Sequence, residues 1–206
     1  MSGFISDQRG AVVVWALLIM ASLLLAWTGT VRITQEVTAT DVDLQRAVQE
    51  AARAAAYQVT AESQANGSPR IGEAAARAAF EQKLRENLGL GATLAPLPGT
   101  ALARAPRYSL AVYNGSAGYG ATAGKRYDFD GVAVTETSLS ASGFPVRFGI
   151  TGVAIQQGTS GTITAELPTP GVVAVVEATL NAAVGRDPMV VTRWSSARVV
   201  WTGWRW

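Results

Sequence analysis

A charge-free apolar run near the N-terminus constrains this chain more than any other feature. From Ala11 to Val31 no residue is charged, and the run reads AVVVWALLIMASLLLAWTGTV. At ~1.5 Å of rise per residue, a helix over this run is roughly 31 Å long, close to the ~30 Å hydrocarbon core of a bilayer. Trp15 and Trp27 lie toward its two ends, where membrane helices place aromatic residues. The run therefore predicts a transmembrane helix over residues 11–31.

Two other interpretations of this run are less consistent with its flanks. A cleaved secretory signal peptide has a basic start and an A-x-A exit, whereas here Asp7 offsets Arg9 and the run ends Ala-Trp-Thr-Gly-Thr. A buried core helix of this length would normally carry a polar face. We therefore expect residues 1–10 to form a short cytoplasmic leader of a single-pass membrane protein. The chain after the membrane helix would lie on the outer side of the membrane.

The helical pattern continues beyond the apolar run. No proline occurs before Pro69, and Asn66-Gly67 is the first strong turn signal. Residues 32–66 are therefore expected to form a projecting amphipathic segment. Its helix would be continuous with the apolar helix and would end at residue 65. Small side chains on one stripe of this helix would let another helix approach closely. This stripe is the candidate helix-association face, with packing inside the chain as the alternative, and it comprises Ile33, Val37, Leu44, Val48, Ala51 and Ala55.

Residues 67–206 predict an α+β head outside the membrane. A second helix is expected from Pro69 or Gly72 to Leu88, with Gly89 as its stop signal. After Gly89, short runs rich in β-branched and aromatic residues alternate with glycine- and proline-rich turns, which is typical of strands. We expect one antiparallel sheet covered on one face by the helices. The candidate strands are Arg107–Tyr113, Arg126–Thr135, Pro145–Ile155, Gly161–Glu166, Val172–Asn181 and Val190–Trp201.

The composition argues against catalysis. The chain has no cysteine and no histidine, which removes thiolate chemistry, the Ser-His-Asp triad and imidazole metal ligands. A net charge of +2 is too small to indicate nucleic acid binding. Asp128, Asp130 and Glu136 carry oxygen ligands that suit Ca²⁺, but alternation along a strand explains their positions. We assign no catalytic residue, metal site or cofactor, although an anchored hydrolase using two carboxylates remains a third alternative.

The C-terminus is rich in tryptophan and arginine. Trp204, Arg205 and Trp206 follow the last candidate strand and are hard to bury so near the end of the printed sequence. Tryptophan and arginine are the residues that most often anchor partners in interfaces. This tail is therefore a candidate partner contact. It supports an alternative function in which the protein is a membrane-anchored module that binds envelope glycan or another protein.

Three segments between residues 9 and 90 share their pattern with a known family. They are Arg9-Gly10-Ala11-Val12 before the apolar run, the alanine-rich segment 44–55 (LQRAVQEAARAA), and segment 79–90 (AFEQKLRENLGL) followed by β-rich sequence. In these segments the chain resembles the TadE/TadG-like pseudopilins of tight-adherence type IV pilus systems. The resemblance implies that a prepilin peptidase cuts between Gly10 and Ala11. It departs from the family at Trp15, where pilins usually carry a glutamate thought to neutralise the N-terminal amine of a neighbouring subunit.

The resemblance and the helical pattern together predict a pilin-like component rather than an enzyme. We expect a structural or assembly component of a type IV pilus or related secretion system that serves in cell adhesion or secretion. It would associate through its helix with copies of itself or other pilin-like subunits. The further partners implied are the prepilin peptidase, an inner-membrane assembly platform and membrane lipid, and no nucleic acid. The location implied is the bacterial cytoplasmic membrane, or an extracellular filament.

Overall fold

The computed structural model describes residues 8–181 and 187–199, and within the first helix it describes the side chains at residues 15–28 and from residue 43 onward. The chain divides into two compact units, Met1–Thr40 and Asp41–Trp206. The helix α1 (Gln8–Ala56) begins in the first unit and ends in the second. The last turns of α1 therefore belong to the head.

The predicted membrane-spanning helix over residues 11–31 is wrong. In the part of the chain that the structure describes, none of the helices has an apolar stretch long enough to cross a membrane. The apolar side chains of α1 that are described run from residue 15 to residue 28.

Helix α1 ends earlier than its alanine-rich sequence predicts. It stops at Ala56 rather than continuing to residue 65, and the short helix α2 (Ala61–Ala65) follows after a break. In the break, the Thr60 N–H donates to the Arg70 carbonyl at 2.9 Å, and the Gly72 N–H donates to the Gln58 carbonyl at 2.8 Å. Because this pairing uses backbone groups that a continuing helix would need, the contact between distant segments overrides local helix propensity.

The helix α3 (Glu73–Leu88) begins directly after Gly72 and ends at Gly89. Gly89 has a φ of 63°, in the left-handed region, and its N–H caps the helix by donating to the Arg85 carbonyl. This conformation is available to glycine at little cost and closes many helix C-termini. The predicted end of the second helix is confirmed.

The head holds two antiparallel sheets rather than the single sheet that the sequence predicted. The larger sheet has the strand order β3-β2-β1-β7-β8 and the smaller one has the order β5-β4-β6. The larger sheet comprises β1 (Arg107–Tyr113), β2 (Gly124–Phe129), β3 (Val134–Ser138), β7 (Gly171–Leu180) and β8 (Met189–Arg198). The smaller sheet comprises β4 (Val146–Thr151), β5 (Ala154–Gln157) and β6 (Ile163–Leu167).

Two predicted strands are each split by a turn that contains glycine. The run Arg126–Thr135 is interrupted at Gly131, which has a φ of 102°, and the run Pro145–Ile155 is interrupted at Gly152, which has a φ of 57°. The flanking strands then pair with each other, β2 with β3 and β4 with β5. Alternation of apolar and polar residues continues across such tight turns, so the pattern did not reveal them.

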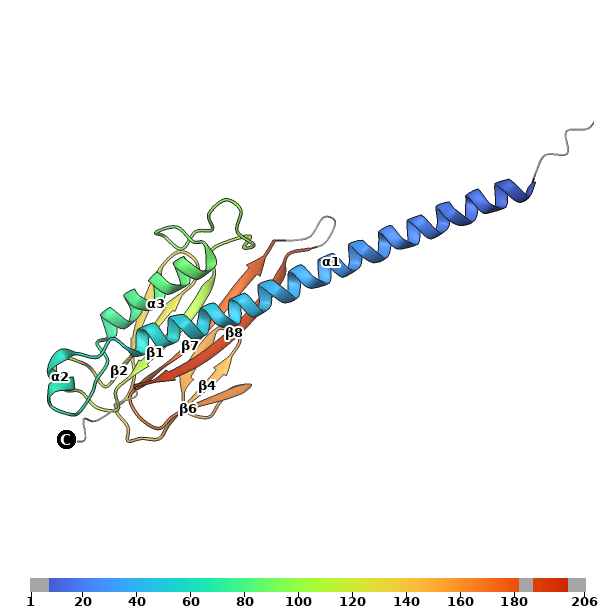
Figure 1. Cartoon of the computed structure of the whole chain (residues 1–206). Coiled ribbons are helices and arrows are strands. Elements are labelled where there is room, and N and C mark those ends of the chain that lie inside the picture. The colour runs from blue at the N-terminus through green and yellow to red at the C-terminus, as the bar shows by residue number, and fades with distance from the viewer. Residues whose placement is uncertain (1–7, 182–186, 200–206) are drawn as a thin grey trace, which may run out of the picture. The chain divides into compact units, whose positions relative to one another are not determined.

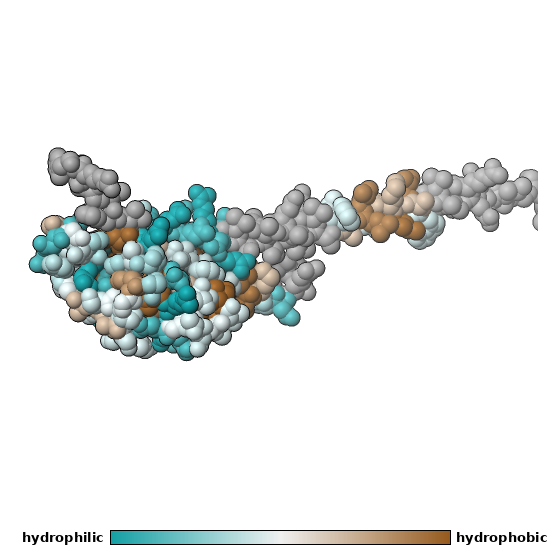
Figure 2. Space-filling model, turned by 90° about the horizontal axis from the view of Figure 1, so that it is seen from below, coloured by the Kyte–Doolittle hydropathy of each residue, from teal (hydrophilic) through white to brown (hydrophobic). Residues whose placement is uncertain are grey.

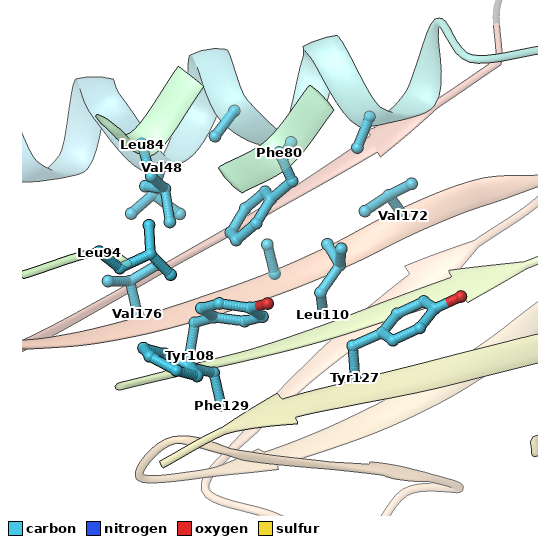
Figure 3. Packing of buried hydrophobic residues seen from close by; sticks show 14 of the residues in the cluster. Val48, Phe80, Leu84, Leu94, Tyr108, Leu110, Tyr127, Phe129, Val172 and Val176 are labelled. Carbon is cyan, nitrogen blue, oxygen red and sulfur yellow. The ribbon is translucent and has the colours of Figure 1, made fainter. Parts of the chain in front are cut away.

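Helices α1 and α3 cover one face of the larger sheet (Figure 1). Side chains alternate between the faces of a strand, and Tyr108, Leu110 and Val112 of β1 point to the helical side. Phe80 of α3 packs edge-on against Tyr108 with ring centroids 5.2 Å apart (Figure 3). The centre of this core is therefore built from one helix face and alternate residues of the central strands.

The opposite face of the larger sheet packs on the smaller sheet. Ala111 and Tyr113 of β1 and Val173 of β7 point into this second core, where they meet Phe148 of β4. Strand β7 is thus buried on both faces. Its continuous apolar run, rather than alternation, is typical of a strand between two layers.

A polar cluster lies between α3 and the larger sheet. The Tyr108 hydroxyl donates to Glu81 Oε1 at 2.5 Å, and Arg77 Nε lies 2.9 Å from the same oxygen. Burial is the main cause that raises the pKa of Tyr108, and the hydrogen bond to Glu81 is the second. Burial, together with the nearby carboxylates Glu136 and Glu73, raises the pKa of Tyr127 to about 12.

The packing of α3 predicts a large cost for truncating its buried face. Leu84→Ala is expected to lower the free energy of unfolding by about 2–5 kcal/mol, because Leu84 is fully buried and its truncation leaves a cavity. Leu97→Ala is the matched control, since Leu97 is about half exposed, and it should cost far less. Urea denaturation of both variants measures the difference, and equal costs would contradict this packing of α3.

The raised pKa of Tyr127 predicts a loss of stability at high pH. An unfolded tyrosine ionises near pH ~10, so between there and about 12 the folded chain keeps a proton that the unfolded chain has lost. The resulting stabilisation is complete below the unfolded pKa and is lost as the pH rises through the folded pKa. Tyr127→Phe should therefore show a smaller fall in the free energy of unfolding over this range. The control is Tyr57→Phe, at an exposed tyrosine, whose free energy of unfolding should fall as much as that of the unmodified chain. An equal fall in the free energy of unfolding for the unmodified chain and both variants would refute the expectation.

Candidate functional site

Most of the large apolar residues that are exposed in the described chain lie on α1. We call residues 15–28 the apolar segment; it carries no charged residue. Figure 2 shows part of it as a brown surface. Its large side chains are more than half exposed on successive positions around the helix, with Leu25 73% exposed. These exposed residues are Trp15, Leu17, Leu18, Ile19, Met20, Leu23, Leu24, Leu25 and Trp27.

The hydroxyl groups of the apolar segment are satisfied within the helix. Ser22 Oγ donates to the Leu18 carbonyl at 2.8 Å, and Thr28 Oγ1 donates to the Leu25 carbonyl at 3.0 Å. A hydroxyl paired in this way does not demand a polar partner when the surface is covered. The apolar segment can therefore be buried without leaving these donors unpaired.

An exposed surface of this kind marks an interaction site. Apolar patches that exceed a few hundred Å² are rare on monomeric proteins and usually belong to an interface. Covering one leucine-sized side chain contributes about 1.5–3 kcal/mol, so a few of these residues suffice for a stable contact. We therefore regard the apolar segment as the candidate functional site.

The structure places the described part of the predicted association stripe inside the head. Leu44, Val48, Ala51 and Ala55 are at most 2% exposed and belong to the core formed with α3 and the larger sheet. Their small size lets α1 pack closely within its own chain, which is the alternative that the sequence left open. No surface of these four side chains is left for a partner. Ile33 and Val37 lie in α1, and their side chains fall outside the described residues.

The other predicted site residues lie outside the described side chains. Gly10 and Ala11, the candidate cleavage site, fall within α1, but their surroundings are not among the described residues. Trp204, Arg205 and Trp206, the candidate partner-contact tail, follow residue 199, the last that the structure describes. Both assignments stay predictions.

A pocket of about 720 Å³ opens at one end of the larger sheet. We call it the end pocket. It lies where β1 and β8 end and β7 begins, and loops from four parts of the chain form its walls. Its lining combines apolar rings and hydroxyl groups with one guanidinium. The lining includes Pro69, Arg70, Ala141, Phe144, Thr169, Pro170 and Val199.

Arg70 ties two of these loops together. Its guanidinium donates to the carbonyl oxygens of Asn114 and Ser116 and, through Nη2, to Ser116 Oγ at 3.0 Å. A Cβ added at Gly118 would lie 3.0 Å from Arg70 Nε, so the glycine lets the loop close over the guanidinium. Within the described ranges, no carboxylate forms an ion pair with Arg70.

The buried side-chain amide of Asn114, in the lining of the end pocket, bonds to the backbone of a distant segment. Asn114 is 2% exposed, and its Oδ1 accepts from the Ile71 N–H at 2.8 Å while its Nδ2 donates to the Ile71 carbonyl at 3.0 Å. Glu73 Oε1 accepts from the Thr122 N–H at 2.5 Å and from Thr122 Oγ1 at 2.7 Å. These bonds join Ile71, just before α3, and Glu73, its first residue, to the loop after β1. Local sequence patterns do not reveal these bonds, because the partners lie more than forty residues apart in the sequence.

The acidic residues considered for Ca²⁺ are separately engaged. Asp128 pairs with Arg126 at 2.7 Å and accepts from Ser109 Oγ at 2.6 Å. Asp130 accepts from the Ala133 and Val132 N–H groups of its turn, which lower the pKa of that carboxyl. Among the described residues, no group of three or more acidic side chains could hold a metal ion.

Comparison with known proteins identifies no relative. No protein-family model, no curated protein and no solved structure matches this chain. The fold and the surfaces described above therefore carry the functional argument.

The buried amide predicts a specific loss of stability. Asn114→Ala should lower the free energy of unfolding by about 1–3 kcal/mol for each buried group of Ile71 left unpaired. Asn87→Ala is the control, because Asn87 is exposed and makes one side-chain hydrogen bond to Glu50. Chemical denaturation measures the free energy of unfolding of both variants. If Asn114→Ala lowers it no more than Asn87→Ala does, the Asn114 amide does not hold the loop after β1 to the segment at Ile71.

Proposed function

We propose that this protein is a pilin-like structural component of a tight-adherence or other type IV pilus, or of a related secretion system. It acts by association of subunits through its N-terminal helix. The observation that supports this function is the apolar segment, whose large side chains are exposed around the helix. A helix that is apolar on all sides is stable in water only when other apolar surfaces cover it.

The occupant that best fits this surface is the same segment of other copies of the chain. The apolar segment has no charge, so identical segments can pack together without burying an unpaired ion. Its hydroxyl groups are already bonded to its own backbone. Ser22 and Ala26 lie one turn apart, and small residues at this spacing let two helix backbones approach closely.

The buried stripe of α1 gives this association a mechanical consequence. Because Leu44 and Val48 are built into the core of the head, a partner that holds the helix also holds a folded domain. Pulling the last turns of α1 out of the head would expose these side chains at about 1.5–3 kcal/mol each. In this proposal, the stripe anchors the helix to its head, and the apolar segment joins the subunits.

The resemblance to TadE/TadG-like pseudopilins supplies the processing step of the proposal. A prepilin peptidase would cut between Gly10 and Ala11 and leave the apolar segment close to the new N-terminus. Trp15 would then contribute apolar surface at the position where pilins usually have glutamate, and it is 67% exposed. Association would rest on apolar packing without that carboxylate. An assembly platform and copies of the chain are the proposed partners.

A single charge in the apolar segment should prevent assembly. Leu24→Glu is expected to weaken self-association at least tenfold, because packing would bury an unpaired carboxylate. Leu97→Glu is the matched control, since it adds the same charge at an exposed leucine of the head. Sedimentation of the purified chain and recovery in sheared surface filaments measure association.

The outcomes separate the functions considered for this chain. Loss of association for Leu24→Glu with normal assembly of Leu97→Glu supports the pilin-like function. Normal assembly of both variants refutes association through the apolar segment. A chain that stays monomeric in unmodified form, yet binds envelope glycan saturably, would favour the binding module instead.

A further inference from the structure

The described chain ends at the wall of the end pocket. Val199 lines the pocket, and its N–H donates to the carbonyl of Pro170, another lining residue, at 2.9 Å. The residues that follow in the sequence are Val200-Trp201-Thr202-Gly203-Trp204-Arg205-Trp206. Three of these seven residues are tryptophans, and in the sequence they follow Val199, which lies in the pocket wall.

The lining of the end pocket suits an indole ring. Pro69, Phe144 and Pro170 contribute rings from three different loops. Arg70 contributes a guanidinium that has no ion-pair partner in the described part of the chain, and arginine stacks favourably on the face of tryptophan. Hydroxyl and carbonyl groups at the rim can accept a hydrogen bond from an indole N–H, which needs such a partner when buried.

The length of the tail is compatible with the size of the pocket. At about 3.3 Å per extended residue, the five residues from Val199 to Trp204 reach roughly 16 Å. A pocket of about 720 Å³ is about 11 Å across if it is equally wide in all directions. Trp201 and Trp204 are therefore both within reach of it.

We propose that the segment 200–206 of this chain lies in the chain's own end pocket. An indole of the segment packs among Pro69, Phe144 and Pro170 and stacks on the Arg70 guanidinium. The tail then completes the end of the sheet and is not a free surface for glycan or protein. This inference goes beyond the function proposed above and does not depend on it, because the pocket lies wholly in the head.

Thiol labelling tests the occupancy of the pocket without background, because the chain has no cysteine. Ala141→Cys places one thiol in the pocket lining, and Ala154→Cys places one at an exposed position on β5 outside it. Each is combined with replacement of Trp201, Trp204 and Trp206 by serine, which keeps the length of the tail. The rate of maleimide labelling is measured for all four full-length chains, and circular dichroism confirms that each is folded.

The proposal predicts that removing the three indoles speeds labelling at position 141 at least tenfold and changes the rate at position 154 less than twofold. Equal rates at position 141 with and without the indoles would overturn it. Protection that disappears on dilution would also overturn it, since the tail of another copy would then fill the pocket. If Ala141→Cys fails to fold, Thr169→Cys at the exposed rim provides the same comparison with the same two outcomes.

Discussion

The structure of the head depends on the burial of one face of α1 against the larger sheet. Almost no surface is exposed at Leu44, Val48, Ala51, Ala52, Ala55 and Ala56, so α1 lies directly on its neighbours. Alanine combines high helix propensity with a small side chain, and it therefore both forms the helix and permits this approach. Helix α3 completes the same layer through Phe80 and Leu84. Without these two helices, one whole face of the sheet would be open to water.

Strand β7 is the second constraint, because it contributes to both cores. Val172 and Val176 point to the helices, while Val173 and Val175 point to the smaller sheet. The helix α3 and strand β1 could be predicted from sequence because their signals are local: a glycine stop at Gly89 and the run Arg107–Tyr113. The second sheet could not, since local alternation does not say which strands share a sheet. The break after Ala56 was missed for a similar reason, as it depends on pairing with residues 70–72.

The candidate site was only partly visible in the sequence. Its apolar residues were evident, but the predicted membrane crossing was wrong, because no helix among the described residues is long and apolar enough to cross a membrane. The association stripe showed the correct helical spacing, yet spacing cannot distinguish a face that meets its own sheet from a face that meets another subunit. The end pocket was not predicted, because residues such as Arg70, Asn114 and Phe144 come together only through the fold. In the proposed assembly the apolar segment joins the subunits, and the buried stripe of α1 anchors the helix in the head.

Disulfide trapping between subunits tests the central claim most directly. Ile19→Cys gives a chain with a single thiol within the apolar segment, because the natural sequence has no cysteine. Oxidation of the native assembly should produce covalent dimers through position 19, whereas Leu97→Cys, an exposed position of the head, should remain monomeric. That result would place the apolar segments of neighbouring subunits side by side. Dimers formed through position 97 but not through position 19 would contradict the account.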